Sequence, residues 1–446
     1  MAKTVTLFVC NECGYESGKW YGKCPECNSW NSFTQVAQAD KKATRSTSSR
    51  TVMAPQNIGK IQSVAEKRTS TGYSEFDRVL GGRGDNVGMV PGAVMLLSGD
   101  PGVGKSTIML QLGLNLAKAG KTVVYVTGEE SESQVKMRAE RIAPVKTLES
   151  LPLFILATTD IDSALESATQ VKPDLVIVDS VQTMVSQDLT GFAGSIPQIR
   201  YATSRLVTFA KSKNIPVYLI GHVTKDGMVA GPMMLSHMVD TVLYLEGEPL
   251  TGTRILRTFK NRFGDTSEVG IFIMEESGLV ELSDASSFFV DKKDGSVPGS
   301  CVAVVMEGSR PLLVEIQALV VPSNLAYPRR VANGIAEKRL ELLLAVLQKH
   351  VRVPIERMDI FVNVVGGLKI QETAVDLAVC LAIVSSFQGK ALRSTVAVAE
   401  VGLLGEVKHV VNLEKRIKEA GKLGFKTVVS AKDGQFLNSI VKRSIV

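Results

Sequence analysis

Short apolar runs rich in β-branched residues alternate with helical patterns in the middle of the chain, from about residue 61 to residue 285. The runs lie at residues 93–97, 122–126, 175–178, 217–220 and 241–245. Strands that alternate with helices along a sequence are typical of a parallel sheet covered by helices. The pattern therefore predicts an α/β domain in this region.

A second alternating region follows at residues 290–446. It contains predicted strands such as 301–305 and 361–365. Its predicted helices are 335–348, 373–384 and 413–420. We interpret it as a second α/β domain, and no repeat of fixed period links it to the first.

The alternation is missing before residue 61. Residues 1–35 hold four cysteines and both tryptophans of the chain. Residues 36–60 have no apolar periodicity and carry five Lys or Arg residues against Asp40 alone, which is typical of a flexible basic linker. The expected divisions of the chain are thus 1–35, 36–60, 61–285 and 290–446.

Composition adds few constraints. The 446 residues are 45% hydrophobic and 22% charged, as in ordinary globular proteins. No apolar run approaches the roughly 18–20 residues that span a bilayer, and the first residues lack a signal-peptide core, so we expect a cytoplasmic protein without a membrane partner. The net charge of +6 is compatible with a polyanionic partner but is not diagnostic.

Four cysteines near the start form two C-x2-C pairs separated by ten residues. They are Cys10, Cys13, Cys24 and Cys27. Each pair can direct two thiolates at one ion, and four thiolates make a closed, structural Zn²⁺ site. The alternatives are four free cysteines or an iron site. The nearby Trp20, Tyr21 and Trp30 could stack on bases, but we expect them to pack a small core around the zinc.

Residues 99–107 read GDPGVGKST, which fits the phosphate-binding pattern G-x4-G-K-[ST]. The glycines let backbone N–H groups face phosphate oxygens, Lys105 reaches the β- and γ-phosphates, and Ser106 offers its hydroxyl to Mg²⁺. The predicted helix 107–119 directs its amino end at the anion. We therefore predict an ATP site on nine consecutive residues. They are Gly99, Asp100, Pro101, Gly102, Val103, Gly104, Lys105, Ser106 and Thr107.

Acidic residues follow two of the predicted strands. Asp179 ends the run DLVIVD, where a carboxylate can hold the water shell of Mg²⁺. Glu129 and Glu130 lie just beyond the strand 122–126, at the end where open parallel sheets place their chemistry. We expect Glu129 to polarise the attacking water. The alternatives are the same role for Glu130, or a helix-capping role for the acidic pair.

Further motifs occur along the rest of the chain. They are CNECG, KWYGKCPECNSWN, TGYSEFDRVLGG, TGEES, IVDSVQT, GHVTKDGMVAGP, HMVDTVLYLEG, FKNRFG and VGLLGEV. With them, nearly the whole chain resembles the bacterial RadA (Sms) family of DNA-repair ATPases, which is related to RecA. The resemblance implies a C4 zinc finger at 1–35, a RecA-like ATPase core at 61–285 and a domain similar to the Lon protease domain at 290–446.

The same resemblance implies a function. A DNA-dependent ATPase of this family is expected to form a hexameric ring that loads on single-stranded DNA. It would promote branch migration of recombination intermediates alongside a RecA-type recombinase. ATP, Mg²⁺ and Zn²⁺ are the implied cofactors.

The resemblance also assigns roles to residues outside the P-loop. His222 would sense the γ-phosphate, and the loop 224–235 with Lys225 would face DNA, although a structural histidine and a solvated turn are the alternatives. Lys260 and Arg262 in FKNRFG follow a predicted strand at 255–259. They are surface charges, contacts to DNA phosphates, or cations that reach the γ-phosphate of a neighbouring subunit. The resemblance marks the motif as functional without separating the last two roles.

The C-terminal domain lacks the residues that a Lon-type protease needs. Residues 366–380 contain no Ser, Thr373 is their one hydroxyl, and Glu414 with Lys415 beside it stands where the catalytic Lys is expected. A Ser–Lys dyad requires a desolvated amine beside a hydroxyl. We expect a scaffold that supports ring assembly and offers DNA a basic surface, unless its cations form only a solvated face. The candidate cations are Lys338, Arg339, Lys408, Lys415, Arg416 and Lys418.

The sequence thus predicts a DNA-remodelling ATPase. A nucleotide-switched regulatory or binding module is the alternative. An ATP-dependent protease is less favoured because of the missing Ser.

Overall fold

The computed structural model describes most of the chain. It covers residues 6–10, 15–26, 28–37, 57, 67–221, 232–247, 252–282, 290, 297–392 and 395–445. The chain divides into two compact units. The first comprises Met1–Glu246, Leu256–Thr266 and Glu275–Leu279, and the second comprises Gly247–Ile255, Ser267–Met274 and Val280–Val446.

The amino-terminal part of the first unit contains a small antiparallel sheet in the order β2-β1-β3. Its strands are β1 (Thr6–Cys10), β2 (Glu16–Ser17) and β3 (Phe33–Ala37). The pairing of β1 with β3 sets Cys10 opposite Phe33. Cys10, Cys24 and Phe33 are buried together, with Phe8 packed against them.

A parallel sheet in the order β11-β6-β10-β9-β7-β8 forms the body of the first unit, as the alternating pattern predicts. Its strands are β6 (Val94–Gly99), β7 (Val123–Thr127), β8 (Leu153–Ala157), β9 (Leu175–Asp179), β10 (Val217–Ile220) and β11 (Thr241–Gly247). All but β8 coincide with predicted runs. The strand β8 was not predicted, although its five apolar residues could have revealed it.

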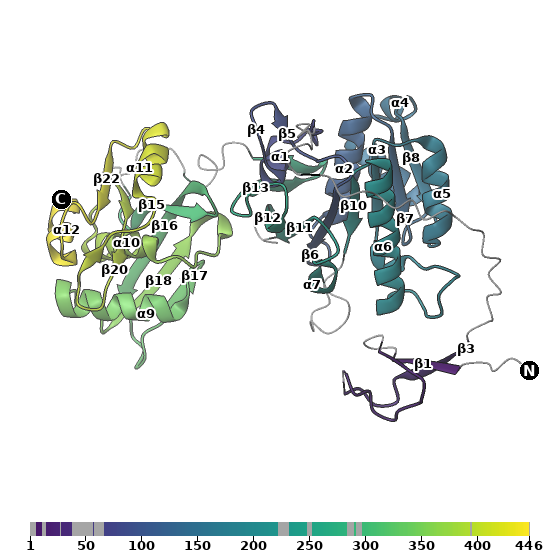
Figure 1. Cartoon of the computed structure of the whole chain (residues 1–446). Helices are drawn as coiled ribbons and strands as arrows, with labels where there is room; N and C mark the ends of the chain where they lie inside the picture. Colours follow the sequence, from purple (N-terminus) through teal and green to yellow (C-terminus); the bar gives the residue numbers. More distant parts are fainter. Residues whose placement is uncertain are drawn as a thin grey trace, which may run out of the picture. The chain divides into compact units, whose positions relative to one another are not determined.

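Helices cover both faces of this sheet (Figure 1). They are α2 (Lys105–Lys118), α3 (Glu132–Ile142), α4 (Val145–Leu148), α5 (Ile161–Val171) and α6 (Ile196–Lys213). Side chains alternate along each strand. Leu96 shares a core cluster with Leu165 of α5 and Leu206 of α6. On the other face, Gly113 brings α2 close, because a Cβ there would lie 3.5 Å from the side chain of Ile177.

Shorter elements complete the first unit. They are α1 (Ser74–Leu80), the β4 (Gly82–Arg83) and β5 (Asn86–Val87) hairpin, a 3₁₀ turn (Val181–Thr183) and α7 (Pro232–Leu235). Beyond β11 the sheet continues in the order β14-β13-β12-β11. These strands are β12 (Thr253–Asn261), β13 (Val269–Glu275) and β14 (Gly278–Glu281), and the division between the units falls within them.

The second unit has a mixed six-stranded sheet in the order β17-β18-β16-β15-β19-β22. Its strands are β15 (Ser300–Glu307), β16 (Arg310–Pro322), β17 (Arg330–Asn333), β18 (Met358–Val364), β19 (Thr395–Val398) and β22 (Thr427–Ser430). A small pair consists of β20 (Glu400–Val401) and β21 (Val407–Lys408). Its helices are α9 (Glu337–Val346), α10 (Asp376–Gln388), α11 (Leu413–Lys422) and α12 (Leu437–Ser444).

The helices predicted in this region are present with shifted ends. A π-helical turn, Leu347–Val351, continues α9, and a 3₁₀ turn, Thr373–Val375, precedes α10. Every residue of α10 from Asp376 to Ser385 is buried, which explains why its sequence is apolar all round. Among the helices in the described part of the chain, none has the length and apolarity needed to cross a membrane.

Candidate ATP site and zinc centre

The P-loop lies between β6 and α2, as expected for a strand–loop–helix phosphate site. β6 ends at Gly99 and α2 begins at Lys105. A Cβ on Gly99 would lie 2.3 Å from the carbonyl oxygen of Leu245 in the neighbouring strand, so only glycine fits there. Gly104 adopts a φ of 107°, which also favours glycine, and it places the amino end of α2 at the loop.

Lys105 is held inside this loop. Its side chain is buried, and its Nζ donates to the carbonyl oxygens of Gly99 and Asp100, each at 2.9 Å. Burial lowers the pKa of Lys105, although nearby Asp179 acts in the opposite direction. These two contacts hold the cationic side chain at the loop. Ser106 and Thr107, half-buried, follow it in the first turn of α2.

Asp179 ends β9 and is buried. Its carboxylate accepts a hydrogen bond of 2.6 Å from the hydroxyl of Tyr125 in β7. Burial raises the pKa of Tyr125 well above its usual value, and the charge of Asp179 adds to the shift, so the phenol remains a donor. This positioning partner was missed in the sequence because an aromatic residue inside an apolar strand carries no motif.

Glu129 and Glu130 have different partners. Ser180, next to Asp179, donates its hydroxyl to Oε1 of Glu129 at 2.6 Å. Glu130 instead forms an ion pair of 2.5 Å with Arg138 of α3. The turn is held by Thr127, whose side-chain oxygen accepts the N–H of Glu130.

Neither glutamate provides the side-chain cap of α3. Its N-cap residue is Ser131, and a capping box joins Ser131 to Gln134. The side chains of Glu129 and Glu130 therefore do not cap α3, in contrast to the alternative that the sequence left open.

β10 lies between β6 and β9 and runs parallel to them, so its carboxyl end lies beside theirs. β10 is followed by Gly221, whose carbonyl oxygen accepts the hydroxyl of Ser98 at 3.5 Å. His222 and the loop residues up to 231, including Lys225, lie outside the described residues. Their predicted roles remain predictions.

Lys260 and Arg262 lie near the amino ends of the parallel strands, whereas the P-loop lies at their carboxyl ends. Nζ of Lys260 donates to the carbonyl oxygens of Ser236 at 2.6 Å and Val239 at 2.8 Å, just after α7. Arg262 is exposed and forms an ion pair of 3.2 Å with Asp240. Asp240 directly precedes β11.

Asp240 connects the motif to the amino end of β6. Its carboxylate accepts the N–H of Val94 at 3.0 Å and Nζ of Lys211 at 2.7 Å, besides Arg262. Burial alone would raise the pKa of Asp240, but hydrogen bonds from Lys211 and Val94 outweigh it, so the pKa is lowered. β6 spans about 16 Å from Val94 to Gly99 at the usual rise per residue. Arg262 is therefore remote from the P-loop of its own chain.

Two of the four predicted zinc ligands lie within the described residues of the amino-terminal segment. Cys10, at the end of β1, and Cys24, outside the strands, are buried in one cluster with Phe33. Cys13 and Cys27 lie outside the described residues. Two buried thiols at the first position of each C-x2-C pair fit a thiolate metal site, whose Zn²⁺ would hold the segment folded.

The aromatic residues of this segment differ from the expectation. Trp20 and Trp30 are 52% and 72% exposed, so they do not pack a core around the metal. Phe33 occupies that position, and Tyr15 and Tyr21 lie against it with ring centroids 6.4 and 6.0 Å away. The tryptophans were misassigned because a sequence shows aromatic content but not which ring points inward.

The C-terminal unit shows no arrangement of a Ser–Lys type among its described residues. The hydroxyl of Thr373 donates to Glu400 at 2.9 Å. Lys415 and Glu414 are exposed on α11, so Lys415 is not a desolvated amine.

Two of the six candidate cations form ion pairs within the second unit instead of a basic surface. Arg416 is 2% exposed and makes a two-pronged pair with Glu372 at 2.9 and 2.7 Å. Arg339 pairs with the buried Asp376. These cations are therefore not available to DNA. Lys338, Lys408, Lys415 and Lys418 are exposed.

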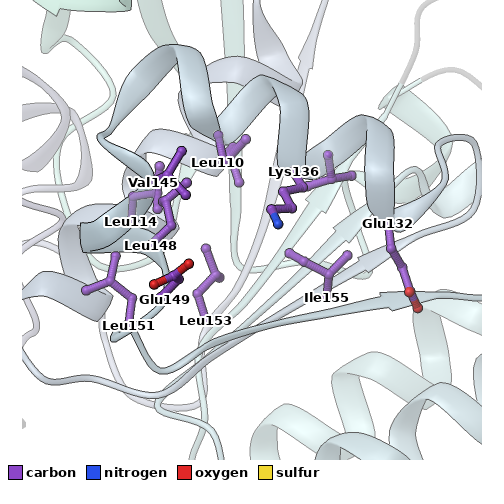
Figure 2. A pocket seen from close by; sticks show the side chains of 12 residues that line it. Leu110, Leu114, Glu132, Lys136, Val145, Leu148, Glu149, Leu151, Leu153 and Ile155 are labelled. Carbon is purple, nitrogen blue, oxygen red and sulfur yellow. The ribbon is translucent and has the colours of Figure 1, made fainter.

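A separate cavity of about 340 Å³ lies between α2, α3, α4 and β8. Leu110 and Leu114 of α2 face Leu153 and Ile155 of β8 across it (Figure 2). Its lining is mainly apolar and includes none of the predicted site residues, so the ATP site is not this hollow.

Two known families match parts of the chain. The family described as "AAA domain" matches residues 86–228, which hold the P-loop, both glutamates and Asp179. The family described as "Rubredoxin metal binding domain" matches residues 8–35, which hold the four cysteines.

Curated proteins of similar length match nearly the whole chain. A protein of Halalkalibacterium halodurans is 45% identical over 96% of this chain and 93% of its own length. One of Bacillus subtilis is 44% identical over 96% of this chain and 93% of its own length, and one of Listeria monocytogenes is 45% identical over 97% and 93%. All three are named "DNA repair protein RadA". A solved KaiC-like protein from Pyrococcus horikoshii matches 49% of this chain and 99% of its own with 18% identity and a TM-score of 0.40.

Proposed function

The chain belongs to the RadA family of DNA repair proteins and is a DNA repair ATPase, and from this premise we propose that it is a motor that loads on single-stranded DNA and promotes branch migration of recombination intermediates. In this proposal it acts as a ring, with six subunits as the expected number, together with a RecA-type recombinase. The observation that carries the proposal is the placement of Lys105, Asp179 and Glu129 at the carboxyl ends of β6, β9 and β7 in one parallel sheet.

Each of these residues has one task in hydrolysis. Lys105 would leave the carbonyl oxygens of Gly99 and Asp100 and turn to the phosphates, where its charge stabilises the transferring group. Mg²⁺, when bound, would be held by Ser106 and by Asp179 through water, and it would neutralise phosphate charge. Glu129, oriented by Ser180, would accept the proton of the attacking water.

The FKNRFG segment supports a ring in which subunits share ATP sites. Arg262 is exposed and lies near the amino end of β6, whereas the P-loop of its own chain follows the carboxyl end of that strand. In a ring with heterologous interfaces, the amino end can face the neighbour's P-loop. We therefore propose that Arg262 reaches the γ-phosphate in trans as an arginine finger.

Lys260 has a different place in this proposal. Its amine is held by the carbonyl oxygens of Ser236 and Val239, so a role in trans requires it to leave them. Contact of both cations with DNA phosphates is the other assignment, and the ATPase rate of mixed Arg262→Ala and Lys105→Ala rings separates the two.

The decisive measurement is the ATPase rate with and without single-stranded DNA. We expect DNA to stimulate turnover, and Lys105→Ala to abolish it. A wild-type rate that DNA leaves unchanged would favour the nucleotide-switched module instead.

The protease alternative has its own test. Casein should remain intact with ATP present, because Thr373 donates to Glu400 and Lys415 is exposed. Proteolysis that is lost in Thr373→Ala would overturn the scaffold assignment of the second unit.

A further inference from the structure

The amino-terminal segment exposes large aromatic rings that its own core does not use. Trp20 and Trp30 are 52% and 72% exposed, while Phe33 is buried. We call these two exposed residues the aromatic platform. Grouped apolar side chains on a surface mark an interaction site more often than single ones do.

The rings of the platform converge. A Cβ on Gly22 would lie 3.7 Å from the Trp20 ring and 4.0 Å from the Trp30 ring, so both indoles end beside this glycine. The backbone is fixed here, because the carbonyl oxygen of Gly22 accepts the N–H of Asn31 at 2.8 Å. Lys23 and Trp30 face each other in an antiparallel bridge. The platform is therefore held in place by backbone pairing and needs little ordering to bind.

Two cations flank the platform. Lys19 and Lys23 are exposed beside it, and Nζ of Lys23 lies 5.8 Å from the ring centroid of Trp30. Aromatic rings flanked by cations bind unpaired bases by stacking while the cations contact phosphates. A duplex offers no free base faces, so a single strand fits this surface.

We propose that the aromatic platform stacks the bases of single-stranded DNA, so that the metal-binding segment is a second DNA-contact surface apart from the ATPase core. The inference rests on the proposed function, because it takes DNA as the partner. Stacking is tolerant of sequence, since every base has a π face. The platform would thus hold the strand without selecting a site.

The chain offers a built-in probe of this contact. It has two tryptophans, and both belong to the platform, so all tryptophan emission of the full chain reports on it. Titration with an oligo-dT of twenty nucleotides should quench this emission. An abasic oligomer of equal length carries the same phosphates, and it should bind by charge yet leave the emission nearly unchanged. A duplex should behave like the abasic strand.

Variants give a second readout. Trp20→Ala with Trp30→Ala should weaken oligo-dT binding about tenfold or more, as measured by anisotropy of a labelled strand. The matched control, Trp20→Phe with Trp30→Phe, should retain most of the affinity because phenyl rings also stack. Both variants should keep the bound zinc and the DNA-independent ATPase rate, since the exposed rings contribute to neither.

Three outcomes would overturn the inference. Oligo-dT that binds the wild type without changing the emission, and binds the double Ala variant equally well, leaves the proposed function standing and removes the platform from it. If single-stranded DNA neither binds to the protein nor stimulates its ATPase, the proposed function is wrong as well. Emission that responds to a RecA-type recombinase but not to DNA makes the platform a protein-docking surface instead.

Discussion

At the scale of single residues, two adjacent glutamates show how different the environments of neighbours can be. Glu129 accepts the hydroxyl of Ser180, beside Asp179, whereas Glu130 is paired with Arg138 on α3. An ion pair at a partly exposed position contributes at most about 1 kcal/mol to stability. The two positions therefore allow a matched comparison of catalysis with local structure.

Glu129→Gln should bind ATP with unchanged affinity and hydrolyse it on the order of a hundredfold more slowly, because the amide cannot accept the proton of the attacking water. Glu130→Gln should keep nearly the full rate. Fluorescent-nucleotide binding and single-turnover hydrolysis measure the two properties separately. The reverse ranking of the two variants would assign the base to Glu130.

At the scale of elements, α11 shows that a cation on a helix is not necessarily a surface charge. Leu413 and Ala420 lie on its inward side, and Arg416 falls between them on the same face. The guanidinium is satisfied there by Glu372 and by the carbonyl oxygen of Val304. Lys415, one residue earlier, points to solvent.

Arg416→Ala should destabilise the second unit by about 3 kcal/mol, because it leaves the partly buried carboxylate of Glu372 without its cationic partner. Lys415→Ala should change stability by less than about 0.5 kcal/mol. Denaturant unfolding followed by far-UV circular dichroism compares them. Equal stability of both variants would mean that the Arg416 pair contributes nothing net.

The amino-terminal segment is an element whose fold should depend on metal. Its core is small, since Cys10, Cys24 and Phe33 are the buried apolar residues of its cluster. Metal analysis should find about one Zn²⁺ per chain, and the Cys24→Ala, Cys27→Ala double variant should lose it. Chelation should then change tryptophan emission without reducing nucleotide binding by the P-loop. Full retention of zinc in the double variant would refute the assignment.

At the scale of the whole molecule, different functional residues lie at the two ends of the parallel strands in the main sheet. The P-loop, Asp179 and Glu129 lie beyond the carboxyl ends of the strands, while Asp240, Lys211 and Arg262 gather at the amino end of β6. If the exposed Arg262 acts on ATP, as we propose, the site that it completes belongs to a second copy of the chain.

Mixing subunits tests this arrangement. Arg262→Ala and Lys105→Ala rings should each be inactive, but mixed rings should recover about a quarter of the wild-type rate. That fraction of interfaces combines an intact P-loop with an intact finger when subunits mix at random. Recovery is measured by ATPase assay after exchange has been verified with labelled subunits. No recovery, together with weaker DNA binding by Arg262→Ala, would assign Arg262 to DNA.

The sequence by itself determined the features that depend on local spacing. The P-loop was located because glycine positions, a preceding apolar strand and a following helix are all readable within about 25 residues. The parallel sheet followed from the alternation of strands and helices, and the two C-x2-C pairs indicated a metal site that a family match now supports. Element ends were less certain, as the π-helical turn after α9 shows.

Only the tertiary structure decided which side chains meet. Tyr125 reaches Asp179 across 54 positions of sequence, and Ser180 reaches Glu129 across 51. It placed Phe33 rather than Trp30 in the amino-terminal core, and it buried Arg416 while leaving Lys415 exposed. A sequence records residue type and local period, whereas burial and pairing depend on distant segments that the chain brings together only when it folds.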